Sequence, residues 1–144
     1  MVGGQLYNMA GAWLNGECLL EYAKQKLPNY QVFDEKRYFV EGNKSSVFTH
    51  KNVCIALTIC EDIWHHEPVA AAKALGAELI LNLNASPFHI NKQTERLSTV
   101  QQHALNHQVS IAYVNLVGGQ DELVFDGGSF VVNASGEVAT ELAL

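Results

Sequence analysis

The chain has 144 residues and a formal net charge of −6; 48% of its residues are hydrophobic and 17% are charged. This length and composition suit one globular domain with a buried core. The negative charge argues against nucleic acid or an anionic membrane as the main partner, and no apolar stretch approaches the ~20 residues that span a bilayer. Three cysteines without close pairing predict a reducing, cytoplasmic location.

The first third of the sequence predicts a hairpin followed by a loop. Residues 6–14 are mostly apolar, Asn15 and Gly16 form a strong turn signal, and residues 17–23 are expected to form the returning strand. The stretch 27–39 contains a proline and many aromatic and charged residues without periodicity, which is typical of a loop.

Strands and helices are expected to alternate through the middle of the chain. Residues 53–59 are almost wholly apolar, as in a strand buried on both faces, and Gly76 is a helix-ending signal. The expected elements are strands over 47–50, 53–59, 79–83 and 110–117, helices over 68–75 and 91–107, and a final hairpin formed by 129–132 and 138–142. This alternation predicts an α/β fold with a central sheet.

Two other features of the sequence do not point to a site. His103 and His107 stand four residues apart on the predicted helix, but no third metal ligand is evident, so they are expected to be surface histidines and no metal is expected. The glycines in 117–120 and 126–129 lack the pattern of a phosphate loop or a dinucleotide fingerprint, and we expect turns there.

The sequence TICED places Cys60 directly after the apolar strand, followed by Glu61 and Asp62. Ligand sites gather where strands of an α/β sheet end, and a nearby helix N-terminus would favour the reactive thiolate. These residues alone leave two interpretations open, because Cys60 is either a nucleophile or a small buried hydrophobe. Cys54 and Cys18 are expected to be structural.

Lys24 follows directly on the second hairpin strand. A lysine in this position is usually a solvated charge at the surface. It is also suited to act as a fixed cation beside a developing oxyanion. The local sequence alone does not distinguish these two roles.

Four ordered stretches resemble the nitrilase superfamily in the form found in glutamine-dependent NAD synthetases. KQKLPNY at 24–30 and residues 32–39 resemble the lysine motif of the superfamily. ICEDIW at 59–64 resembles its nucleophile motif. The substrate-pocket motif is resembled by NLNASPF at 82–88, with Lys92 and Arg96 downstream, and the late strand and loop by residues 113–127.

The resemblance implies part of a nitrilase-like αββα sandwich and hydrolysis of the glutamine side-chain amide by a Cys-Glu-Lys triad. Cys60 would be the nucleophile, and Lys24, with the backbone N–H of Glu61, would stabilise the oxyanion. Glu35 matches a supporting glutamate near the lysine; its alternative is an exposed loop carboxylate. The residues implied to bind glutamine are Tyr30, Glu61, Trp64, Ser86 and Lys92, with Lys92 suited to the α-carboxylate and Glu61 to the α-ammonium group.

The triad glutamate has no match in this sequence. In the family it lies well upstream of the lysine motif, whereas the only carboxylates before Lys24 are Glu17 and Glu21 in the predicted hairpin. The early hairpin also lacks a preceding helix to cover it. We therefore expect residues 1–144 to be a partial carbon-nitrogen hydrolase domain, without the glutamate-bearing part and without a C-terminal ATP-dependent synthetase domain, and to be inactive alone.

In the resembled enzymes the released ammonia serves ATP-dependent synthesis of NAD from deamido-NAD, and ATP and Mg belong to the synthetase domain, so no cofactor is expected in this stretch. The expected partners are glutamine, the synthetase domain and further copies of the full enzyme. Two alternatives remain open: a free-standing amidase of the same superfamily with another amide substrate, and a non-catalytic remnant of the fold.

Overall fold

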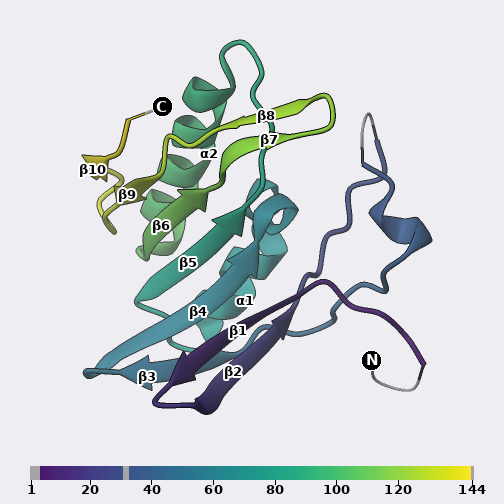
Figure 1. Cartoon of the computed structure of the whole chain (residues 1–144). Coiled ribbons are helices and arrows are strands. Elements are labelled where there is room, and N and C mark those ends of the chain that lie inside the picture. Colours follow the sequence, from purple (N-terminus) through teal and green to yellow (C-terminus); the bar gives the residue numbers. More distant parts are fainter. Residues whose placement is uncertain (1–3, 31–32, 144) are drawn as a thin grey trace.

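The computed structural model describes residues 4–30 and 33–143, so residue 32 of the lysine motif lies outside the described residues. A six-stranded sheet in the order β10-β9-β6-β5-β4-β3 forms the centre (Figure 1). Its strands are β3 (Val47–His50), β4 (Val53–Ile59), β5 (Leu79–Asn84), β6 (Ser110–Asn115), β9 (Phe130–Val132) and β10 (Val138–Glu141).

The middle strands of this sheet are parallel, and its edges are antiparallel. The β4–β5 and β5–β6 pairs are parallel, while β3, β9 and β10 join by antiparallel pairing. Parallel neighbours need a crossover, and helices provide it here. Because β4, β5 and β6 run the same way, their carboxyl ends meet at one edge of the sheet, where Cys60 follows β4.

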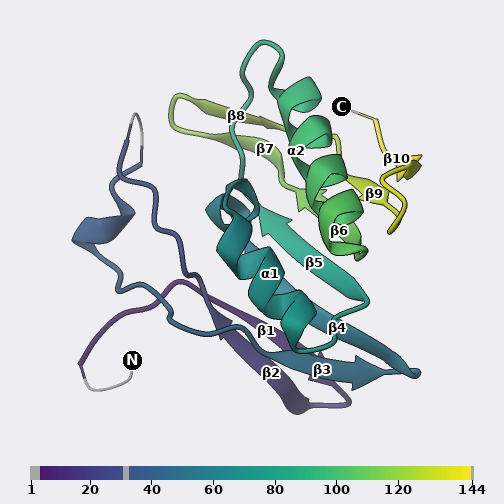
Figure 2. The same cartoon turned by 180° about the vertical axis from the view of Figure 1, so that it is seen from behind.

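Both α-helices lie on the same face of the sheet (Figure 2). They are α1 (His66–Ala74) and α2 (Lys92–His107). Val69 and Ala72 of α1 and Val100 of α2 pack with Ile80 and Ile111 in the larger apolar cluster. Gly76 follows α1 with a φ of +92°, a left-handed conformation that glycine adopts freely, and this confirms the predicted helix end.

A hairpin covers part of the opposite face. It consists of β1 (Met9–Leu14) and β2 (Glu17–Ala23), with the turn at Asn15–Gly16 as predicted. Tyr22 of β2 packs with Leu57 and Ile59 of β4 in a second apolar cluster, so β4 is buried on both faces. Between the hairpin and β3, the described residues include a 3-10 turn, η1 (Glu35–Arg37), within the predicted loop.

The structure corrects two details of the expected elements. The segment 117–120, expected as a turn, is strand β7 (Val117–Gln120), which pairs with β8 (Leu123–Asp126), and β6 ends at Asn115 instead of residue 117. Residues 127–129 of the other expected turn lie outside any strand. The rest of the strand and helix order matches the prediction, and the α/β class is confirmed. Within the described residues, no helix is long and apolar enough to cross a membrane.

Candidate active site

Cys60 lies at a sharp turn between β4 and the 3-10 helix η2 (Cys60–Trp64). Its φ is +43°, in the left-handed region that non-glycine residues rarely adopt. Such a backbone costs about 1–3 kcal/mol and persists only where surrounding contacts enforce it. The turn directs the cysteine towards a cavity that its side chain helps to line.

Lys24 and Glu35 form a buried ion pair beside this turn. Lys24 Nζ lies 2.7 Å from Glu35 Oε1, and the two side chains are only 2% and 18% exposed. The interpretations of Lys24 as a solvated charge and of Glu35 as an exposed loop carboxylate are therefore wrong. A single donor–acceptor contact holds the pair, and Glu35 Oε2 is buried without a hydrogen-bond partner among residues 4–30 and 33–143.

Burial raises the pKa of the Cys60 thiol, and three charges act on it in addition. The Lys24 ammonium opposes that rise in the pKa, whereas the carboxylates of Glu61 and Glu35 add to it. The expected lowering of the pKa by a helix N-terminus does not dominate here, because the turn after Cys60 is a short 3-10 helix and desolvation is larger. Lys24 thus favours the thiolate, and a backbone hydrogen bond from Ala85 adds a smaller lowering of the thiol pKa.

A cavity of about 400 Å³ opens next to Cys60. The five side chains expected to bind substrate all contribute to its wall, although they come from three separate stretches of the chain. The lining residues are Pro28, Tyr30, Phe33, Cys60, Glu61, Trp64, Ser86, Pro87, Phe88, His89, Lys92, Glu95 and Leu123. Phe33, Phe88 and Leu123 lie in the stretches that resemble family motifs but were given no binding role, and His89 and Glu95 lie outside those stretches.

Side chains of both charges line the cavity. Lys92 Nζ lies 4.2 Å from the centre of the Trp64 ring and 3.1 Å from Glu95 Oε2, so an aromatic face and a carboxylate both hold it. Glu61 Oε2 accepts a hydrogen bond of 2.8 Å from the Tyr30 hydroxyl, and burial with this contact raises the tyrosine pKa. One cation, Lys92, and two carboxylates, Glu61 and Glu95, thus line the cavity and could contact a zwitterionic ligand.

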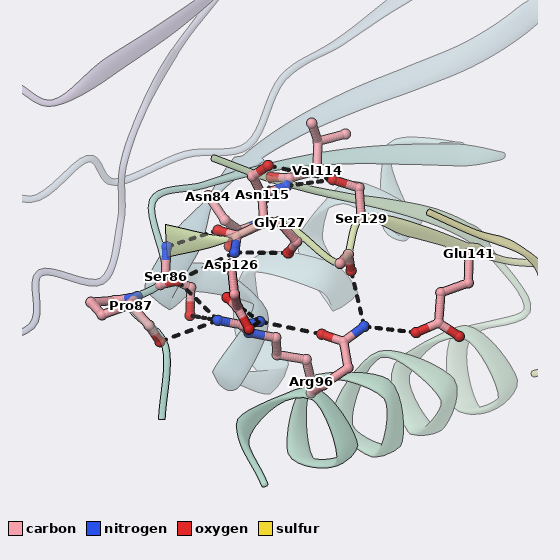
Figure 3. Close-up of polar contacts among 12 residues, drawn as sticks. Asn84, Ser86, Pro87, Arg96, Val114, Asn115, Asp126, Gly127, Ser129 and Glu141 are labelled. Atoms are coloured by element: carbon pink, nitrogen blue, oxygen red, sulfur yellow. Dashed lines mark hydrogen bonds and ion pairs between the residues drawn. The ribbon is translucent and has the colours of Figure 1, made fainter. Parts of the chain in front are cut away.

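Arg96 links the Ser86–Pro87 segment, which contributes to the cavity wall, to Asp126 (Figure 3). It is fully buried, and its Nη2 donates to the carbonyl oxygens of Ser86 and Pro87 and to the Ser86 hydroxyl. Its Nη1 contacts both carboxylate oxygens of Asp126 at 3.0 and 3.2 Å. Asn115 Oδ1 accepts from the Ser86 backbone N–H, so the serine is fixed from two sides.

The histidines differ from their expected surface position. His103 and His107 are partly buried, and their rings stack with centroids 5.9 Å apart, while His66 of α1 lies 4.8 Å from His107. In the described part of the chain, no group of three His, Cys, Asp or Glu residues has a metal-binding arrangement. Of the other cysteines, Cys18 is exposed on the hairpin and Cys54 is half-buried.

The carbon-nitrogen hydrolase family model matches residues 2–143, nearly the whole sequence, in agreement with this geometry. The chain belongs to the carbon-nitrogen hydrolase family. The nitrilase-like resemblance and the αββα fold class are thereby confirmed, because solved members of the nitrilase superfamily share its architecture.

Curated relatives share the sequence over most of this chain. The glutamine-dependent NAD(+) synthetase of Thermotoga maritima is 50% identical over 134 residues, which cover 92% of this chain and 23% of the relative. The Acinetobacter baylyi enzyme of that name is 44% identical, with coverage of 94% and 25%. The chain therefore spans about a quarter of the length of these relatives.

Two solved structures extend the comparison. The glutamine-dependent NAD+ synthetase of Acinetobacter baumannii, in complex with ADP, has a TM-score of 0.95 and 42% identity, covering 99% of this chain and 27% of that one. An amidase of the nitrilase superfamily from Nesterenkonia has a TM-score of 0.76 and 32% identity, with coverage of 89% and 47%. A variant of that amidase carries the acetamide moiety of fluoroacetamide on its active-site cysteine.

Proposed function

We propose that this chain is the amide-hydrolysing part of a glutamine-dependent NAD synthetase, with Cys60 as its nucleophile. The observation that supports it most directly is the position of Cys60 between the Lys24–Glu35 pair and the charged cavity. The identity of up to 50% with named synthetases supports the choice of glutamine over other amides.

In the proposed reaction, the Cys60 sulfur attacks the side-chain amide carbon of glutamine. The carbonyl oxygen becomes an oxyanion, which Lys24 stabilises together with the backbone N–H of Glu61. The proton given up by the Cys60 thiol passes, through the general base of the superfamily's triad, to the amide nitrogen; the C–N bond then breaks, ammonia leaves, and a γ-glutamyl thioester remains. Water attacks this thioester, releases glutamate and returns the thiol. Glu35 holds the Lys24 ammonium in place.

The substrate groups of glutamine match the charges around the cavity. Lys92 would bind the α-carboxylate, and Glu61 would bind the α-ammonium group. Tyr30, Trp64 and Ser86 would contact the remainder of the ligand from the cavity wall. Glu95 pairs with Lys92 when no ligand competes for the ammonium group.

Full activity needs more than these 144 residues in this proposal. The superfamily's triad includes a glutamate base, and the two carboxylates before Lys24, Glu17 and Glu21, are both exposed on the hairpin. Losing a general base lowers the rate by about 10²–10⁴. The ammonia would serve ATP- and Mg-dependent amidation of deamido-NAD by a synthetase domain outside these residues.

The decisive experiment measures glutamate and ammonia release from glutamine by the whole protein and by its Cys60→Ala variant. We expect turnover by the whole protein, none by the variant, and little by the 144-residue chain alone. Wild-type turnover that survives Cys60→Ala would refute the assignment of the nucleophile.

The similarity to the Nesterenkonia amidase favours a second candidate, a free-standing amidase with another amide substrate. A panel of amides separates the two, because an enzyme that supplies ammonia to NAD synthesis should prefer glutamine over acetamide and butyramide. Hydrolysis of none of these amides by the whole protein would instead favour a non-catalytic remnant of the fold.

A further inference from the structure

Asp62 is a fully buried carboxylate whose two oxygens accept hydrogen bonds from four donors. Oδ1 accepts from the backbone N–H groups of Gln25 at 3.0 Å and Lys26 at 2.8 Å. Oδ2 accepts from the Tyr22 hydroxyl at 2.7 Å and from the Ile59 backbone N–H at 2.9 Å. Burial raises the Asp62 pKa, and these four contacts oppose the rise.

The four donors belong to the two segments that meet in the active site. Gln25 and Lys26 follow directly after Lys24, whereas Ile59 is the residue before Cys60. Gln25 and Lys26 are 37 and 36 positions from Asp62 in the sequence, whereas Ile59 is three positions from it. One carboxylate therefore fixes both the backbone beside the lysine and the strained turn of the cysteine.

A carboxylate suits this position better than any other side chain of similar size. It offers acceptor lone pairs only, and all four neighbours are donors. An asparagine would direct its own N–H₂ group at two of those donors, and an apolar residue would leave all four unsatisfied in a buried place. The four donors thus suit a carboxylate at this position, although Asp62 does not line the cavity.

We propose that Asp62 is a positioning residue that sets the distance between the Lys24 ammonium and the Cys60 thiol. This inference rests on the proposed function of these two groups. Asp62 touches no substrate atom; it acts through the backbone of the lysine segment and through the turn before the nucleophile. When the hydrogen bonds of Asp62 are lost, the Lys24 ammonium no longer lies close enough to the Cys60 sulfur to stabilise the thiolate.

A double-mutant cycle on thiol reactivity tests this link without any substrate. The rate of Cys60 alkylation by iodoacetamide is measured against pH in the whole protein, with the exposed Cys18 as an internal reference. Removing a cation close to a thiolate raises the thiol pKa by about 1 unit or more. Lys24→Met should therefore slow Cys60 alkylation at pH 7 by about tenfold or more.

In the Asp62→Asn background, the same Lys24→Met change should slow alkylation by less than about threefold, because the ammonium is no longer held against the sulfur. A purely structural role for Asp62 would leave the tenfold Lys24 effect intact, and that result would overturn the proposal. Tyr22→Phe removes one of the four donors and serves as the mild control, with most of the Lys24 effect retained.

If Asp62→Asn does not fold, Asp62→Glu replaces it. Glutamate keeps the acceptor oxygens but moves them by one carbon–carbon bond, so the Lys24 effect should fall below its wild-type size. An unchanged effect in that variant would also overturn the inference. The proposed function fails on a different measurement, since it requires Cys60-dependent release of glutamate by the wild-type protein.

Discussion

Arg96 is the largest side chain without exposed surface in the described residues, and it lies outside the proposed chemistry. Its guanidinium group joins Ser86 to Asp126 through charge-assisted hydrogen bonds. Arg96→Met would leave the Asp126 carboxylate and the Pro87 carbonyl without their donor. Breaking a buried ion pair in this way costs about 3–5 kcal/mol, so the free energy of unfolding in urea should fall by that amount.

Arg37→Met is the matched control for Arg96→Met. Arg37 pairs with Asp34 at 3.7 Å, but both side chains are more than half exposed. Exposed pairs contribute at most about 1 kcal/mol, so this variant should unfold close to the wild-type urea midpoint. Equal losses of stability in the two variants would show that the buried Arg96–Asp126 pair contributes no more to the free energy of unfolding than the exposed Arg37–Asp34 pair.

Lys92 is the residue on which recognition of the α-carboxylate depends in the proposed function. A hydrogen bond to a charged group contributes about 1.5–3 kcal/mol, so Lys92→Met should raise the KM for glutamine by about tenfold to a hundredfold. The kcat should change little, because the α-carboxylate is remote from the scissile bond. Lys44→Met, at an exposed position, is the control. A fall in kcat without a rise in KM would contradict this role.

The sequence identified the residues whose role is local and missed those whose role depends on distant contacts. Cys60 and Lys24 stand in short stretches that resemble family motifs, and five predicted pocket residues do line the cavity. Asp62 was noted only as a neighbour of the cysteine, since nothing in the local sequence shows that residues 25 and 26 donate to it. The Arg96–Asp126 pair was missed for the same reason, because its two residues lie 30 positions apart and neither local sequence indicates the contact.

At the scale of elements, the helix pair α1 and α2 is joined by three histidines. Burial lowers the pKa values of His103 and His107. Nearby cationic groups lower them further: His107 and then His66 act on His103, and His66 and Lys73 act on His107. Because the folded state disfavours the proton, the unfolded chain binds it more readily below the ordinary histidine pKa of about 6.5. Stability is therefore fully present above that pH and decreases as the pH falls through and below it.

Urea unfolding of the whole protein at pH 7.5 and pH 5.5 measures this effect. The free energy of unfolding should decrease between the two pH values, and His107→Gln should reduce the size of that decrease. His89→Gln changes an exposed histidine outside the helix pair and should leave the decrease unchanged. The same decrease in the wild-type protein and in His107→Gln would rule out this histidine contact as its source.

Element order was predictable because apolar runs and turn residues agree along most of the chain. The strand at 53–59 and the helix end at Gly76 follow from composition and backbone freedom. The β7–β8 pair was missed because its strands contain adjacent glycines at 118–119 and polar residues, and β7 is exposed throughout, so no apolar alternation marks it. Its pairing reflects the turn geometry and the neighbouring chain more than its own propensity.

At the scale of the whole molecule, the two faces of the six-stranded sheet differ. The helices cover one face, while the β1–β2 hairpin covers β4 on the other (Figures 1 and 2). Leu83 and Val114 pair with each other on the hairpin face, beyond the part that packs under Tyr22, and they are 41% and 46% exposed. Leu116 continues this apolar surface at 47% exposed.

An exposed apolar sheet face of this kind promotes association in water. The 144-residue chain produced by itself should therefore show, by light scattering at micromolar concentration, a mass above its 15.8 kDa. Val114→Lys places a charge in the middle of that face and should shift the mass towards the monomer. Leu75→Lys changes an equally exposed leucine after α1 and should not. A wild-type chain that remains monomeric would show that this surface is too small or too irregular to drive association.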